Sequence, residues 1–421
     1  MNRLDFFIIA PTPFYYNRGC NILIRGEAEA LQKKGFRVLV ATFQPGASAG
    51  ALEIKRAPLT SWGFSNKVAA TWKKIPAGFF LFFTVLKIIV AKRPKIIYCH
   101  LLEGLLIGLV ARFIGRIVFS FRYRPLLILD TQGGRVQEMK AYWMIKNPVF
   151  CQPGDYLEKI LLRCPDITFT SSLAYKEKLT RQKHSDHGTK IIHLPDAISL
   201  FDWKNKKACL QKDIEKDKAL AKLANCLTGG DNDLLKQWIK EKKSVLVYAG
   251  SFTRGKGIIE FINQLVPRLA EKNENIRFLL GGGGISELGI SPENLEKLKD
   301  KLIVLSDLNS RNLPYFLLLG DLAIDPKLPR TTESSGKILN YMALGLPVIC
   351  FDQPNNRFFL GENGIYATDE NNLLVLLEKA LENLPELKAI GEKNYQRAWE
   401  RFTWDKQVDK IIDYTKEVIR N

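Results

Sequence analysis

The chain has 421 residues, which is too long for one hydrophobic core and suits two α/β domains. Hydrophobic residues make up 46% and charged residues 25%, the composition of a soluble globular protein. The seven cysteines form no CxxC pair and the four histidines form no HExxH motif, so common metal-site and disulfide patterns are excluded. A reduced, cytoplasmic environment is the simplest interpretation.

The net charge of +18 predicts an anionic partner. Nucleic acid, an anionic membrane and an anionic substrate are the alternatives. The sequence contains no zinc finger, no RNP-like aromatic motif and no obvious basic recognition helix. We therefore expect no nucleic-acid partner, and binding driven by charge alone is kept as a rival.

The first half of the sequence alternates short apolar runs, typical of strands, with helical patterns. Strands are predicted at residues 6–10, 37–43, 95–99, 126–129, 167–170 and 190–194, with a first helix at residues 21–34. This alternation predicts a parallel sheet with helices on both faces. The run at residues 6–10 is too short, and is interrupted too soon, for a signal peptide.

A dense apolar run at residues 79–86 has basic neighbours, which are Lys73, Lys74, Lys87, Lys92 and Arg93. The run is too short to span a bilayer. Residues 105–121 repeat the pattern, with Arg112 and Arg116 on one helical face. Apolar residues beside basic ones suit helices lying on an anionic membrane surface. Buried helices between parallel strands are the alternative.

The second half begins with residues 199–243, which are rich in Lys, Asp and Glu and are interpreted as a linker followed by helices. Strands are then predicted at residues 244–249, 276–280, 302–305, 322–324 and 348–351, and helices at residues 258–272 and 404–419. Ligands of parallel sheets bind at the carboxyl ends of the strands. Polar residues that follow strands are therefore the site candidates.

Residues 332–349 are the most informative segment, with the pattern of a loop, a helix, a Gly-Leu-Pro turn and a strand. Ser335 and Gly336 begin the helix, where backbone N–H groups point outward, and Lys337 adds a positive charge. These features predict a cradle for a phosphate or diphosphate. An ordinary helix start with a serine N-cap is the alternative.

The sequence from Gly336 to Val348 resembles the donor-site signature of the retaining glycosyltransferase family four. Residues 10–19, 247–257 and 401–404 are similar to other segments of the same family, in the same order. The resemblance implies the GT-B fold, which has two Rossmann-like domains facing across a cleft. The implied parts are an acceptor domain at residues 1–198, a nucleotide-sugar donor domain at residues 199–400, and a C-terminal helix at residues 401–421 that packs back on the first domain.

The resemblance also implies which residues bind the donor. Lys256 matches a family lysine that contacts the donor diphosphate, whose departure a cation would stabilise. Ser251 stands where many members have arginine, and Arg254 is the expected substitute. A solvated loop lysine is the alternative for Lys256. The expected donor-binding residues are Gly250, Arg254, Lys256, Ser335, Gly336, Lys337 and Asn340.

The sequence departs from the family at two glutamates that flank the donor helix. Thr332 and Asn340 occupy the corresponding positions. Glu333, next to the first position, is the candidate for its catalytic role. Asn340 can still hydrogen-bond a ribose hydroxyl.

The acceptor-side candidates follow strands of the first domain. Gly19 permits close backbone approach to a bound group. Asp130, Gln132 and Glu138 follow one strand, where carboxylates can hold sugar hydroxyls or direct the acceptor proton. Helix capping by Asp130 and solvent exposure of Glu138 are the alternatives. His100 follows another strand, where a lone histidine is more often structural.

We therefore expect a glycosyltransferase that moves a sugar from a nucleoside-diphosphate sugar to a glycan or lipid-linked acceptor at the inner face of the cytoplasmic membrane. Asp130 and Glu333 are the expected catalytic residues. The family implies retention of configuration. We expect no cofactor and no metal, because no DxD triplet stands where a metal-dependent family would need one. A nucleotide-sugar epimerase of similar architecture and an inactive membrane-associated scaffold are the alternatives.

Overall fold

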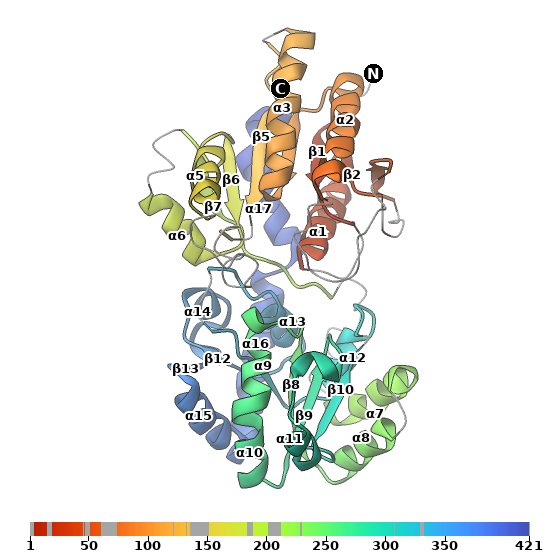
Figure 1. Ribbon diagram of the computed structural model, residues 1–421, viewed down its shortest axis with the longest axis vertical. Helices are drawn as coiled ribbons and strands as arrows, with labels where there is room; N and C mark the ends of the chain where they lie inside the picture. Colours follow the sequence, from red (N-terminus) through yellow and green to blue (C-terminus); the bar gives the residue numbers. More distant parts are fainter. Residues whose placement is uncertain are drawn as a thin grey trace. The chain divides into compact units, whose positions relative to one another are not determined.

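The computed structural model describes residues 4–14, 19–44, 46, 51–59, 74–120, 122–131, 133–134, 151–182, 188–200, 212–227, 230–306, 308–328 and 332–420. The chain divides into two compact units (Figure 1). The first comprises Met1–Ala197, Thr331–Ser334 and Trp404–Asn421, and the second comprises Ile198–Arg330 and Ser335–Thr403.

The described residues of the first unit form a parallel sheet of seven strands in the order β3-β2-β1-β4-β5-β6-β7. The strands are β1 (Phe6–Ala10), β2 (Val38–Thr42), β3 (Glu53–Arg56), β4 (Ile96–His100), β5 (Leu126–Thr131), β6 (Ile167–Thr170) and β7 (Lys190–His193). The helices are α1 (Gly19–Lys33), α2 (Lys74–Lys92), α3 (Leu101–Phe119), α5 (Cys151–Leu161), α6 (Leu173–Arg181) and α17 (Trp404–Arg420).

The central strands of this sheet are continuous apolar runs, and successive residues of a strand point to opposite sides. Both faces of the sheet are therefore apolar. On one face, Ile97 and Leu127 belong to a core shared with α2 and α3. On the other face, Tyr98 and Ile128 belong to a core shared with α1 and α17. Helices therefore cover the sheet on both sides, as the strand–helix alternation predicted.

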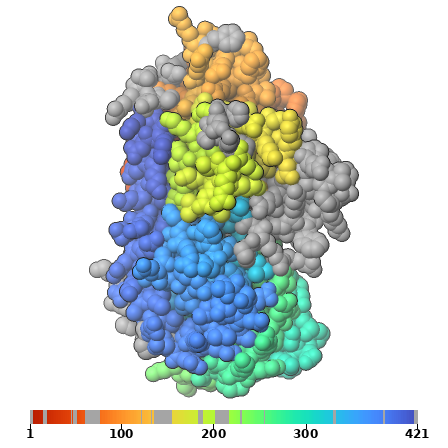
Figure 2. Space-filling view, turned by 90° about the vertical axis from the view of Figure 1, so that its left-hand side faces the viewer, coloured from red at the N-terminus to blue at the C-terminus, as the bar shows by residue number. Residues whose placement is uncertain are grey.

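The helix α17 returns to the first unit after the second unit is complete. Val408 and Ile411 are buried in the core that includes α1. Lys34 pairs with Asp409 at 2.6 Å. Figure 2 shows α17, in dark blue, beside the yellow-green segment that contains β6 and β7.

The described residues of the second unit form a parallel sheet of six strands in the order β10-β9-β8-β11-β12-β13. The strands are β8 (Ser244–Ala249), β9 (Ile276–Gly281), β10 (Leu302–Leu305), β11 (Leu322–Asp325), β12 (Val348–Phe351) and β13 (Ile365–Ala367). The α-helices are α7 (Lys212–Leu223), α8 (Asp231–Lys240), α9 (Ile258–Glu260), α10 (Val266–Lys272), α11 (Pro292–Lys297), α12 (Leu313–Leu318), α13 (Lys337–Ala343), α14 (Pro354–Leu360), α15 (Glu370–Glu382) and α16 (Leu384–Arg401). A π-helical turn, Phe261–Leu265, joins α9 to α10, and the 3-10 turns are Ala224–Cys226, Arg254–Lys256, Ile285–Leu288 and Gly361–Asn363.

The predicted fold class, α/β with two parallel sheets, is confirmed. Two short strands escaped prediction. β3 is a partly exposed edge strand with the polar sequence EIKR, and β13 has three residues, so neither shows the apolar run of a buried strand. Across the described residues, no helix is both long enough and apolar enough to cross a bilayer.

We predict that Gly26→Ala destabilises the first unit by about 1–3 kcal/mol, because a Cβ at this position would overlap the indole ring of Trp404. Gly78→Ala in α2 is the matched control, since no atom lies within 4 Å of its Cβ position. That control should be neutral or slightly stabilising. Thermal unfolding measures both, and equal melting temperatures for the two variants would contradict the packing of α17 on α1.

Candidate functional site

The donor-side candidates lie at the carboxyl edge of the second sheet. β8 leads into Gly250, and the neighbouring β11 ends at Asp325. A Cβ at Gly250 would lie 2.9 Å from the Tyr248 hydroxyl and 3.1 Å from Lys337 Cε. The parallel register therefore brings Gly250 and Lys337 together, although 87 positions separate them.

Lys337 is engaged in a buried ion pair. Its Nζ lies 2.8 Å from Asp325 Oδ1, and the Asp325 side chain is fully buried. Burial alone would raise the pKa of Asp325, but the charge and hydrogen bond of Lys337, together with smaller effects of Ser335 and Lys327, hold this pKa below its ordinary value. Burial would likewise lower the pKa of Lys337, and Asp325 raises it instead. Lys337, which the sequence predicts as a cation for the donor diphosphate, is thus already paired with a carboxylate.

Lys256 ends the 3-10 turn Arg254–Lys256, and its side chain is half-buried. The next residue, Gly257, has φ +73°, and a Cβ there would overlap the Pro326 carbonyl. Only glycine suits this backbone. The close approach holds the Lys256 turn against the end of β11. The charge of Lys256 acts on Tyr248 and Lys337, which places it in the same group. The side chain of Arg254 lies outside the described residues.

The remaining donor candidates belong to the start of α13. Gly336 is its N-cap residue, and Ser335 is buried just before it. Asn340 is buried, and its Oδ1 accepts hydrogen bonds from the backbone N–H and hydroxyl of Ser199, both at 3.0 Å. Its amide group is therefore occupied within the second unit, which limits the predicted contact with a ribose.

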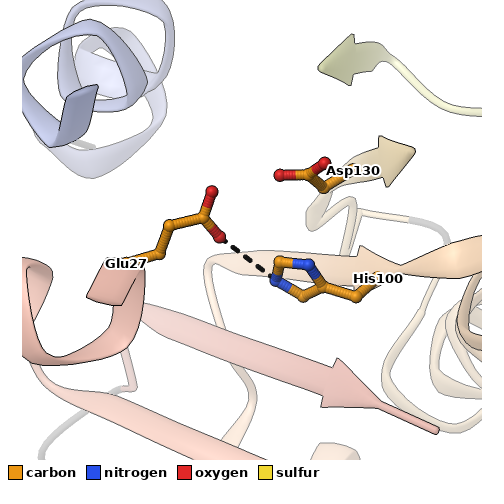
Figure 3. Close-up of side chains that lie close together, drawn as sticks. All are labelled: Glu27, His100 and Asp130. Atoms are coloured by element: carbon orange, nitrogen blue, oxygen red, sulfur yellow. Dashed lines mark ion pairs between the residues drawn. The ribbon is translucent and has the colours of Figure 1, made fainter. Parts of the chain in front are cut away.

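The first unit contains a buried polar cluster made by Glu27, His100 and Asp130 (Figure 3). His100 Nε2 lies 3.3 Å from Glu27 Oε2, and their side chains are 2% and 1% exposed. Asp130 is 3% exposed, and its Oδ2 accepts a hydrogen bond from the Tyr98 hydroxyl at 3.1 Å. The cluster thus combines two carboxylates and an imidazole away from water.

Burial dominates the protonation of this cluster. It lowers the pKa of His100 to about 3, so the imidazole is neutral. It raises the pKa of Asp130 to about 6, although hydrogen bonds to Glu27 and Tyr98 act in the opposite direction. Burial and then the Asp130 charge raise the pKa of Glu27 well above its ordinary value.

Strand register explains this grouping. His100 and Asp130 are partners in the parallel pairing of β4 with β5, so both point to the face covered by α1. Glu27 reaches them from α1, where Ile24, Ala28 and Leu31 are buried. Glu27 was not among the site residues predicted from the sequence. The available signal was a carboxylate on the apolar stripe of a helix.

The other candidates are not brought into this cluster. Gly19 begins α1 and is exposed, and no described residue beyond its chain neighbours places an atom within 4 Å of its Cβ position. Glu333 is half-buried in the short segment Thr331–Ser334 of the first unit. Gln132 and Glu138 lie outside the described residues.

Part of the sequence and the whole fold are similar to known proteins. Residues 243–384 match the family model of the glycosyl transferases group 1. Sucrose-phosphate synthase from Thermosynechococcus elongatus is similar in structure, with a TM-score of 0.72 at 15% identity over 99% of this chain and 100% of that chain. The catalytic domain of starch synthase IV from Arabidopsis thaliana, bound to ADP and acarbose, gives 0.71 at 13% identity over 100% of both chains. HepE from Anabaena, in complex with UDP and glucose, gives 0.64 at 15% identity over 98% of this chain and 100% of that chain. No curated protein sequence matches the chain.

The fold of the whole chain is that of the GT-B glycosyltransferases. Within it, residues 243–384 are a glycosyl transferases group 1 region, about a third of the chain. The fold predicted from the sequence is confirmed, and the predicted resemblance is confirmed over residues 243–384. The match favours sugar transfer over the epimerase alternative.

We predict that Lys337→Met destabilises the second unit by about 3–5 kcal/mol, because it leaves Asp325 as an uncompensated buried charge. Asp325→Leu combined with Lys337→Met should recover most of this loss, since a buried ion pair and an apolar pair of similar volume are close in stability. Lys297→Met is the control, because its ion pairs are exposed, and should have little effect. Urea unfolding measures all three.

The same pair has a pH signature. The folded-state pKa of Asp325 lies below its unfolded value, so its stabilisation is full above the unfolded pKa and is lost as pH falls through the folded one. The difference in stability between the wild type and the doubly substituted variant should therefore shrink below about pH 4. A double variant no more stable than Lys337→Met would contradict the assignment of the pair.

Proposed function

We propose that the chain transfers a sugar from a nucleoside-diphosphate sugar to a hydroxyl of a glycan or lipid-linked acceptor. The observation that carries the proposal is the position of Lys256 and Gly250 at the carboxyl edge of β8, inside the group 1 region. Two solved structures with the same fold hold UDP or ADP. This supports a nucleoside diphosphate as the leaving group here.

In the proposed reaction, the bond between the sugar C1 and the diphosphate oxygen breaks, and its electron pair leaves with the nucleoside diphosphate. The acceptor hydroxyl forms the new glycosidic bond and releases its proton. Lys256 stabilises the negative charge of the leaving group. Glu333 is the candidate carboxylate near the transferred sugar. Retention of configuration and independence from metal at the diphosphate are part of the proposal and rest on the family resemblance and on the lysine.

The acceptor proposal rests on an apolar face of the first unit. Here α2 packs against α3, and α3 packs against α5. The exposed apolar side chains of this face are Phe79, Phe83 and Val90 of α2, Leu106, Val110, Phe113 and Ile117 of α3, and Tyr156, Leu157 and Ile160 of α5. Phe79 and Phe113 are each 60% exposed. Exposed apolar side chains gathered on neighbouring helices are the kind of surface that serves as an interaction site.

Basic residues accompany the apolar face. Lys87 and Lys92 are exposed on α2, and Lys159 is exposed on α5. Arg93 follows α2, with its guanidinium carbon 4.0 Å from the centre of the Phe119 ring. Apolar side chains among cations match a bilayer with anionic headgroups. We therefore propose that this face rests on the inner leaflet of the cytoplasmic membrane, where a lipid-linked acceptor would lie. The inactive scaffold of the sequence analysis would share this face but lack turnover.

We predict that Lys256→Ala weakens binding of the nucleoside diphosphate by about 1.5–3 kcal/mol, the value of a charge-assisted contact. Lys240→Ala is the control, since this lysine is exposed at the end of α8 in the same unit. Titration calorimetry with UDP, ADP and GDP gives the affinities. Equal affinities in both variants would contradict the proposal that Lys256 contacts the diphosphate.

We predict binding to vesicles that contain phosphatidylglycerol, weakening with added salt, and weak binding to neutral vesicles. Lys87→Glu with Lys92→Glu should reduce the binding at least about tenfold, since each basic residue contributes on the order of 1 kcal/mol. Phe79→Ser with Phe113→Ser should also release the protein.

The control for the membrane experiment is Ile285→Ser, which removes an exposed apolar side chain from the second unit. It should bind vesicles as the wild type does. Sedimentation that does not distinguish anionic from neutral lipid, or losses equal in the control and in the Phe79 and Phe113 variant, would rule out the proposed face and favour a soluble acceptor.

A further inference from the structure

The cluster of Glu27, His100 and Asp130 gathers two buried carboxyl groups around one imidazole, and the proposed sugar transfer does not use it. Two carboxylates lie together in a site with almost no solvent exposure. Within the part of the chain that the structure describes, no lysine or arginine pairs with either of them. Buried carboxylates without a cation are costly. The buried Asp325 of the second unit, by contrast, has Lys337.

Two of the ligand atoms, one from His100 and one from Glu27, face each other without a hydrogen bond. His100 Nε2 and Glu27 Oε2 are 3.3 Å apart, and among the described residues neither atom has a hydrogen-bond partner. Ligand atoms about 2.0–2.1 Å from a tetrahedral zinc ion would lie about 3.3–3.4 Å from each other. One ligand atom from each of Glu27, His100 and Asp130 lies within 4.8 Å of the others. The three groups are therefore close enough to share one bound ion.

The surroundings orient these groups as metal ligands are oriented. The Tyr98 ring lies 4.8 Å from the His100 ring, between centroids, at a tilt of 32°. The Tyr98 hydroxyl donates to Asp130 Oδ2. Hydrogen bonds of this kind fix ligating carboxylates in metal sites.

We propose that Glu27, His100 and Asp130 bind one divalent transition-metal cation of the zinc type. Imidazole and carboxylate together suit zinc, cobalt or manganese, whereas magnesium prefers oxygen ligands and retained waters that this enclosed site does not favour. The cation neutralises the two carboxylates and fastens α1 to β4 and β5. The site is built wholly from the first unit, whereas Lys256 belongs to the second, and the metal proposal does not rest on the proposed function.

The test is metal binding by tag-free, chelator-treated wild-type protein. Cobalt titrated at pH 7.5 should bind one to one, with the visible absorption of a four- or five-coordinate ion, and zinc should displace it. Glu27→Gln and Asp130→Asn should each weaken zinc binding by more than about 100-fold, and Tyr98→Phe by about 10–100-fold. His193→Asn is the control, because His193 also ends a strand but is only half-buried, with its ring nitrogen 3.2 Å from the Ser171 carbonyl oxygen.

Two further outcomes decide the proposal if the variants do not fold. X-ray absorption at the zinc edge of the wild type should show nitrogen and oxygen ligands, and sulfur ligation would overturn the assignment. Absence of stoichiometric binding at micromolar metal would also overturn it, as would unchanged affinity in Glu27→Gln and Asp130→Asn. In those cases the cluster holds a proton shared between two carboxyl groups.

Discussion

The parallel pairing of every described strand is the constraint on which both candidate sites depend, because it directs the carboxyl ends of neighbouring strands to one edge of each sheet. In the second unit, Gly250 after β8 and Asp325 at the end of β11 lie at the same edge of the sheet. In the first unit it sets His100 beside Asp130. A helix then adds the third residue of each group: α13 contributes Lys337 in the second unit, and α1 contributes Glu27 in the first.

Burial decides what these charged groups can do. Lys337 neutralises Asp325, and the Asn340 amide is hydrogen-bonded to Ser199. Both side chains therefore have partners within the second unit. The half-buried Lys256 therefore stays the main candidate for the proposed diphosphate contact, as the sequence predicted. In the first unit the enclosed Asp130 is turned toward Tyr98 and the cluster. The proposed transfer therefore does not depend on Asp130 as an acceptor base.

The long buried strands could be predicted from the sequence because each is a continuous apolar run, as in Phe6–Ala10 and Ser244–Ala249. The strand-end positions of His100 and Asp130 could be predicted for the same reason. Their pairing could not, since strand order is a tertiary property. Glu27 was not predicted because its partners, His100 and Asp130, are far from it in the sequence and no local pattern indicates the contact. The Asp325–Lys337 pair was missed because a lysine at a helix start also fits an anion site. Roles for Gly19 and Glu333 stay predictions.

The central claim is that a nucleoside-diphosphate sugar binds the second unit, and the most direct measurement is the melting temperature with a panel of nucleotide sugars and their nucleoside diphosphates. A ligand that binds only the folded protein adds about 2.7 kcal/mol of stability at 100 times its dissociation constant. The account predicts that one nucleotide series raises the melting temperature, with the sugar and its diphosphate both effective. No shift with any member of the panel, at millimolar concentration, would contradict it.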